Sequence, residues 1–156
     1  MPFGRTGMEG ELHKMLLISG LLAVSSPAAR AEDVLVMDPQ QALNSAEFKA
    51  GLGNDVAFYF IGAPTPAVKT DMEGFLVDRV TRRSSGPPET NCRRVLVAAF
   101  RDFQARARKK GGNAVVNMVS FYRKHYAADS TMVECHISSE VKARIVLRGT
   151  VPLVDK

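Results

Sequence analysis

The chain has 156 residues, with 21 lysines and arginines, 16 aspartates and glutamates, two cysteines and no tryptophan. This length fits one domain with a core of its own, and a hydrophobic content of 46% argues against general disorder. The formal net charge of +5 allows an anionic partner without requiring one.

An apolar run near the N-terminus predicts a secretory signal peptide. Residues 15–24 form the run, His13-Lys14 gives it a positive start, and the stretch Ala29-Arg30-Ala31 has the small residues of a cleavage site. We expect cleavage after Ala31, so that residues 1–31 are removed and residues 32–156 form a single periplasmic domain.

Other interpretations of this run fit the sequence less well. A buried core helix is disfavoured by Gly20 and Pro27, and ten residues are too few to span a bilayer. We therefore expect no membrane-spanning segment. Met1, Met8 and Met15 all fit as the start of translation.

The first half of the predicted domain contains a helix followed by two strands. Asp38 is suited to cap a helix with Pro39 in its first turn, which predicts a helix over Gln40–Ala50. The run Val56–Ile61 predicts a largely buried strand, and Phe75–Arg83 predicts a second, less regular one.

The second half combines one long helix with three strands. Asn91 can cap this helix, and Gly111-Gly112 ends it after a basic last turn. Strands are expected over Asn113–Tyr122, 133–137 and 141–147. One face of the helix carries an apolar stripe of Cys92, Val95, Leu96, Ala99 and Phe103. We therefore predict a two-layer α+β fold, with the main helix packed on a mostly antiparallel sheet.

Two independent patterns direct the cysteines toward the same core. Cys92 lies on the apolar stripe of the helix, and Cys135 lies on the apolar side of its strand. In an exported protein such a pair favours a disulfide, whose loop of about 44 residues would stabilise the domain by roughly 4 kcal/mol. The alternatives are two buried free thiols or two metal ligands, although neither cysteine belongs to a CxxC pair.

The histidines give a weaker signal. His136 directly follows Cys135, so alternation places it on the opposite face beside Glu134, where an exposed surface histidine is the favoured interpretation. The two side chains could supply two ligands to a divalent metal, but the sequence indicates no third. His125 is also expected to be exposed.

Motifs that mark common enzyme classes are missing from the sequence. We find no phosphate-binding loop, no GxSxG elbow and no HExxH helix. The stretch Gly111-Gly112-Asn113 ends a helix and is too short for a dinucleotide fingerprint. We therefore predict a protein that is not an enzyme, with no catalytic residue and no cofactor.

Basic residues concentrate around the main helix. Residues 79–110 contain ten lysines and arginines but two acidic residues. Arg94, Arg101 and Arg108 are spaced by seven and share the helix face opposite the stripe. A solvated helix face is the favoured interpretation. The alternative is an anion-binding surface for lipid head groups, polysaccharide or an acidic partner protein, whereas nucleic acid is disfavoured for an exported protein.

The segment from Ala105 to Asn117, with its basic helix end followed by GGNAVVN, resembles the YbjQ-type domain and its relative, the envelope stress sensor RcsF. The chain from residue 32 onward also resembles small exported proteobacterial proteins with Cys-Arg in the helix, GGNAVVN and Glu-Cys-His. These proteins are sometimes labelled "excinuclease ATPase subunit", a function that no phosphate loop supports here. Residues 32–88 lie outside the YbjQ-type match.

The resemblance implies a compact α+β domain of the cell envelope. For YbjQ-type domains it implies homo-oligomers and heavy-metal binding, and for RcsF-like proteins a role in sensing or protein contact. It supplies no catalytic residue. Our expectation is an exported, non-enzymatic domain that binds an envelope protein or anionic component, with a metal-binding module as the alternative.

Overall fold

The computed structural model describes residues 32–70, 74–84 and 86–154. The predicted signal peptide, its cleavage site and the three alternative starts lie outside these residues. In the described part of the chain, no helix is both long and apolar enough to cross a membrane.

The elements are β1 (Asp33–Met37), α1 (Pro39–Leu43), α2 (Ala46–Gly51), β2 (Ala57–Phe60), β3 (Val68–Thr70), β4 (Gly74–Thr81), α3 (Pro88–Lys109), β5 (Ala114–Tyr122), β6 (His125–Tyr126), β7 (Val133–Ile137), β8 (Ala143–Thr150) and β9 (Leu153–Val154).

Two short helices follow β1. Asp38 caps α1 as predicted, because its side-chain oxygen accepts a hydrogen bond from the backbone N–H two residues on, at 2.8 Å, and Pro39 occupies the first turn. The single helix predicted over Gln40–Ala50 is wrong. Ser45 interrupts it and caps α2 by accepting a hydrogen bond from the backbone N–H of Phe48. This second cap positions Phe48 against the core.

The long helix α3 differs from its prediction at one end. Pro87 is the N-cap and Pro88 stands in the first turn, where proline costs no hydrogen bond, so the helix begins before Asn91. Asn91 is buried within the helix and does not cap it. At the other end Gly111 adopts a left-handed conformation with φ of 72°, and the next N–H donates to the carbonyl of Ala107 at 2.8 Å. The predicted glycine cap is therefore confirmed.

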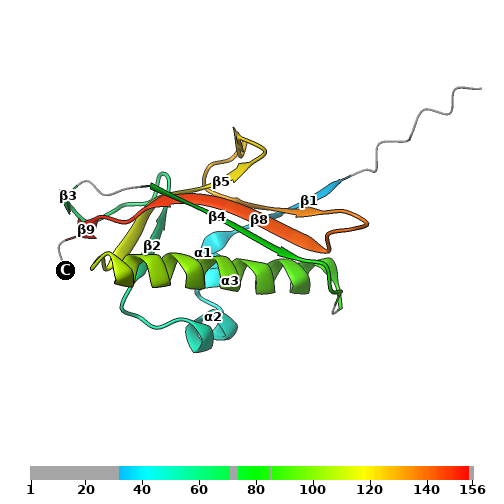
Figure 1. The fold of residues 1–156 in the computed structure, drawn as a ribbon, viewed down its shortest axis with the longest axis horizontal. Coiled ribbons are helices and arrows are strands. Elements are labelled where there is room, and N and C mark those ends of the chain that lie inside the picture. The colour runs from blue at the N-terminus through cyan, green and yellow to red at the C-terminus, as the bar shows by residue number, and fades with distance from the viewer. Residues whose placement is uncertain (1–31, 71–73, 85, 155–156) are drawn as a thin grey trace, which may run out of the picture.

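The sheet is organised around β8 (Figure 1). β4 pairs antiparallel with all of β8, from Gly74 opposite Thr150 to Thr81 opposite Ala143. The other edge of β8 is shared, with β7 pairing at Arg144 and β5 pairing further along. β1 extends the sheet beyond β7, and β2 extends it beyond β5 as the parallel pair. β3 and β9 pair separately. The predicted α+β class and mostly antiparallel sheet are confirmed.

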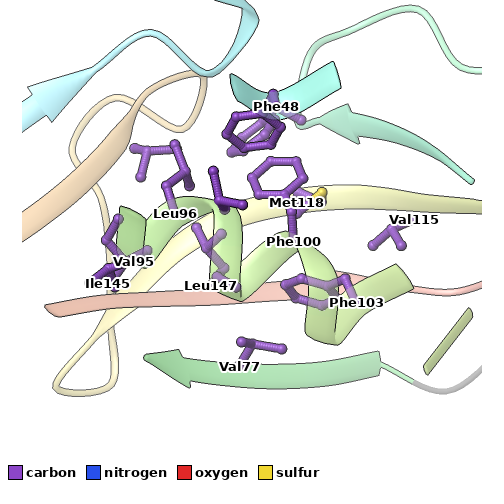
Figure 2. Close-up of a cluster of buried hydrophobic side chains, with 14 of the residues drawn as sticks. Phe48, Val77, Val95, Leu96, Phe100, Phe103, Val115, Met118, Ile145 and Leu147 are labelled. Carbon is purple, nitrogen blue, oxygen red and sulfur yellow. The ribbon is translucent and has the colours of Figure 1, made fainter. Parts of the chain in front are cut away.

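The inner face of the sheet packs against α3 (Figures 1 and 2). Phe100 is fully buried at the centre, with ring-centroid distances of 5.1 Å to Phe48 and 4.6 Å to Phe58. Edge-to-face contacts of this kind add to the area that the rings bury. The sheet and α3 complete this core with Val77, Leu96, Phe103, Val115, Met118, Ile145 and Leu147.

Candidate functional site

A basic cleft lies between the end of β4 and the first turns of α3. Its volume is about 460 Å³. Arg79 from β4, Arg83 from the following loop and Arg94 from α3 all line it, together with the buried Asn91. None of the described residues that line this cleft is acidic. The lining therefore brings three cationic side chains together at one cleft.

The arginines that line the cleft differ in their contacts and exposure. Arg79 donates two hydrogen bonds to the carboxylate of Asp102 on α3, a pairing that raises the pKa of Arg79. This pair connects β4 to α3 across one end of the cleft. The Thr81 hydroxyl accepts a hydrogen bond at 3.2 Å from the backbone N–H of Arg83, which holds the chain as it leaves β4. Arg83 and Arg94 are both exposed at the rim.

The structure separates the three arginines predicted to share one helix face. Arg94 lines the basic cleft, whereas Arg101 donates to the carbonyl of Gly51 at 3.1 Å. Arg108 donates two hydrogen bonds to Asp55, at 2.6 and 2.8 Å. Seven residues of an α-helix fall about 20° short of two full turns, so the spacing drifts around the helix. The drift turns Arg101 and Arg108 toward the end of α2 and the segment that follows it, residues 51–55.

Arg101 and Arg108 connect residues 51–55 to α3 through their hydrogen bonds. Arg108 lowers the pKa of Asp55 by its hydrogen bonds, and Asp55 in turn raises the pKa of Arg108. Gln104, one turn before Arg108, donates to the carbonyl of Gly53 at 3.1 Å. Arg101 and Arg108 thus contact Gly51 and Asp55, and Arg94 is the member of the predicted set that lines the cleft.

The predicted disulfide is present. Cys92 of α3 and Cys135 of β7 are both fully buried, with their Cα atoms 5.9 Å apart, and they are bonded to each other. No free cysteine is found in the part of the chain that the structure describes. This excludes the alternatives of two free thiols and of two cysteine metal ligands. The bond fixes the first half of α3 to β7.

His136 lies on the face opposite Cys135, as predicted, but the expectation that it is exposed is wrong. It is 7% exposed, and its ring is stacked on that of Tyr122, with centroids 3.6 Å apart. Nδ1 lies 3.8 Å from Glu32, and Nε2 lies 3.5 Å from Glu134. Among the described residues, neither ring nitrogen has a hydrogen-bond partner. Burial lowers the pKa of His136, although both carboxylates oppose this shift.

A network of polar side chains surrounds this histidine. The Tyr122 hydroxyl donates to Glu32 at 2.6 Å, and burial together with this bond raises the pKa of Tyr122. Arg123 lies 3.3 Å from Glu32 and 5.0 Å from the Tyr122 ring centroid. Arg144 lies 5.6 Å from the same centroid and is paired with Asp78. We call this set the outer-face cluster: Glu32, Asp78, Tyr122, Arg123, Glu134, His136 and Arg144.

The structure brings the two predicted metal ligands, His136 and Glu134, within 3.5 Å of each other. Glu32 lies beside Nδ1, on the other side of the ring from Glu134. A metal ion bound to Nε2 and Glu134 would therefore not also be coordinated by Glu32. Within residues 32–70, 74–84 and 86–154, no group of three metal-ligating side chains is found. His125 is exposed as predicted, on β6.

Sequence reasoning found neither the basic cleft nor the outer-face cluster as a unit. The cluster joins residues from Glu32 to Arg144, and these contacts depend on the order of strands in the sheet. The concentration of arginines around residues 79–94 was the usable signal for the cleft.

Comparisons of the chain with protein-family models, with curated protein sequences and with solved structures give no match. The interpretation of the site therefore depends on the chain's own residues. Its most distinctive chemistry is the meeting of three arginines in a cleft lined by no described acidic residue.

Proposed function

We propose that the protein is an exported, non-enzymatic binding domain of the cell envelope that holds an anionic group in the basic cleft. The observation that carries the proposal is the lining of this cleft by Arg79, Arg83 and Arg94 without a described carboxylate. The anion belongs to an envelope component or to an acidic protein partner.

Guanidinium chemistry supports this role. Arginine is always charged, and its planar fork binds carboxylate or phosphate oxygens through paired hydrogen bonds. Arg79 is held by Asp102 and keeps a fixed position in the lining, and Arg83 and Arg94 line the same cleft from the loop after β4 and from α3.

Two further observations support an envelope location. The buried Cys92–Cys135 disulfide suits an oxidising compartment, and the predicted signal peptide ends just before Glu32. The resemblance of the GGNAVVN segment to YbjQ-type and RcsF-like domains agrees with a binding or sensing role. These three arguments are independent of the cleft.

The decisive experiment compares two pairs of arginines on the purified oxidised domain. Binding to vesicles of phosphatidylglycerol and phosphatidylcholine, and to a soluble poly-glutamate peptide, is measured with wild type, Arg83→Gln/Arg94→Gln and Arg101→Gln/Arg108→Gln. Both variants lose the same charge. We expect about a tenfold loss of binding in the first and a smaller loss in the second.

The two probes separate a lipid surface from an acidic protein. Binding should also weaken with added salt, since exposed charges are screened. Equal losses in the two variants would show that the whole helix face attracts anions, and the cleft would then have no special role. No binding to either probe at low salt would refute the proposal.

A metal-binding role is the second candidate, and the 3.5 Å approach of His136 Nε2 to Glu134 is the observation that favours it. Both atoms could reach one ion if a third ligand came from solvent or a partner. Calorimetry with zinc and copper on the oxidised protein, with His136→Gln as control, tests this role. No heat at micromolar affinity, or equal heat in the variant, would eliminate it.

A further inference from the structure

β1 forms an open edge of the sheet. It pairs with β7 in regular antiparallel register from Asp33 opposite Ile137 to Met37 opposite Val133, and no other described strand pairs with it. Val34 and Val36 point away from the core and are 48% and 55% exposed. Edge strands are usually blocked by a charge, a proline or a bulge within the strand. β1 has none of these between its ends.

A groove of about 490 Å³ lies along this edge, between β1, α1 and the start of α3. Leu35, Met37 and Ala42 give it an apolar lining, and each of them is only partly buried against the core. Glu89 and Arg93 from α3 bring charge to it. The groove and the open edge therefore lie side by side, with Leu35 and Met37 belonging to both.

We propose that an extended segment of a partner protein adds to β1 as a further strand and places alternate apolar side chains in this groove. Backbone hydrogen bonds to the free edge would supply affinity, and the groove would supply specificity. Side chains of an added strand alternate between the two faces, so every second one points toward the groove. This site shares no lining residue with the basic cleft and does not depend on it.

Charge decides between a partner segment and a second copy of the chain. If two copies paired through β1 antiparallel about Leu35, Glu32 of one would lie opposite Asp38 of the other. A shift by one residue would turn the side chains of one strand to the other face of the sheet, and a shift by two residues would shorten the overlap of the two five-residue strands. Like charges directly opposite are unfavourable in a sheet. Acidic residues at both ends of β1 favour an apolar segment with a basic residue on each side.

The probe is a fluorescent nine-residue peptide in which leucine and threonine alternate between two terminal lysines. We expect saturable binding by anisotropy, with ¹⁵N amide shifts concentrated on residues 33–37. N-methylation of the alternate peptide amides that face β1 should abolish binding, whereas methylation of the other set should not, because only one set donates to the edge.

Two neighbouring glutamines provide a matched pair of variants. Gln41 is exposed and lines the groove, whereas Gln40 is exposed on the same short helix without lining it. Gln41→Trp should fill the groove and weaken peptide binding about tenfold or more, and Gln40→Trp should not. Asp33→Lys should weaken the lysine-flanked peptide about two- to fivefold and strengthen a glutamate-flanked one, the scale of an exposed ion pair.

Several results would overturn the inference. Equal binding by both N-methylated peptides would exclude strand addition, and amide shifts away from β1 would exclude this edge. A dimer in sedimentation experiments that Val36→Lys disrupts, but Val80→Lys on β4 does not, would assign the edge to a second copy. Arg83→Gln/Arg94→Gln should leave peptide binding unchanged, so failure at the edge and failure at the basic cleft are distinguishable.

Discussion

The inner face of the sheet is packed with apolar side chains against α3, whereas the outer face carries ion pairs and stacked rings around His136. On the inner face, Phe100 and Leu96 are fully buried, and the Cys92–Cys135 disulfide crosses between the layers. On the outer face, pairs such as Arg144 and Asp78 remain about two-fifths exposed. Apolar burial and a cross-link contribute several kcal/mol each, while exposed ion pairs contribute about 1 kcal/mol or less. The inner face of the sheet therefore contributes most of the free energy of unfolding, and substitutions on the outer face should cost less stability.

The largest effect is expected from removing the central ring of the inner face. Phe100→Ala should lower the free energy of unfolding by about 5 kcal/mol, since the ring is fully buried and its aromatic neighbours cannot fill the space. Denaturant unfolding followed by circular dichroism measures this. Leu76→Ala, on the exposed side of β4, is the control and should change stability by about 0.5 kcal/mol or less. Similar losses in both variants would remove the distinction between the faces.

The disulfide should have the next largest effect. Replacing Cys92 and Cys135 together by alanine releases a cross-link between residues 43 apart, which corresponds to about 4 kcal/mol on the chain-entropy model. The measurement is again denaturant unfolding, with thiol titration of the wild type under denaturing conditions. The oxidised wild type should show no reactive thiol. Two reactive thiols in protein purified from an oxidising compartment would contradict the bond.

These inner-face features could be read from the sequence, and the outer-face features could not. The spacing of Cys92 and Leu96 along a helix, and the alternation of Cys135 along a strand, each report one local period. Both periods place a cysteine in the layer between helix and sheet, and the disulfide could therefore be predicted from the sequence. The stacking of Tyr122 on His136 depends instead on β5 and β7 both pairing along β8, which no local pattern encodes.

The same limit explains the incorrect expectations. Alternation correctly assigned His136 to the outer face, but it gave no information about what covers that face. The heptad spacing of Arg94, Arg101 and Arg108 was real, yet the segment containing Asp55 could not be placed beside α3 from sequence. Long-range contacts between polar residues are set by topology, whereas apolar periodicity is set locally.

The buried histidine offers a third test, one that concerns the outer face alone. Burial holds the pKa of His136 below its ordinary value of 6.5, so the unfolded chain binds a proton at a higher pH than the folded one does. Stability is therefore fully present above pH 6.5 and falls as the pH drops below it, with a slope of at most about 1.4 kcal/mol per pH unit. Unfolding measured between pH 7.5 and 5.5 should show this slope.

Two variants assign the slope to one side chain. His136→Phe keeps an aromatic ring against Tyr122 and should remove the slope, while His125→Phe, at an exposed position, should preserve it. Glu32 and Glu134 flank the ring and oppose the shift. If their attraction for the protonated ring outweighed its burial, stability would rise as the pH fell, and the sign of the slope would reverse.

The smallest effect is expected at the hairpin between β5 and β6, next to the outer-face cluster, and it has the opposite sign. Arg123 and Lys124 form its turn with φ of 49° and 66°, a left-handed conformation that costs a side chain about 1 kcal/mol or more. Lys124→Gly should relieve this strain and raise the free energy of unfolding by up to about 1 kcal/mol, because the entropy of glycine in the unfolded chain offsets part of the gain. Lys124→Ala removes the same charge but keeps the Cβ atom, so it should give no gain. An equal gain in both variants would mean that charge, rather than backbone strain, limits this turn.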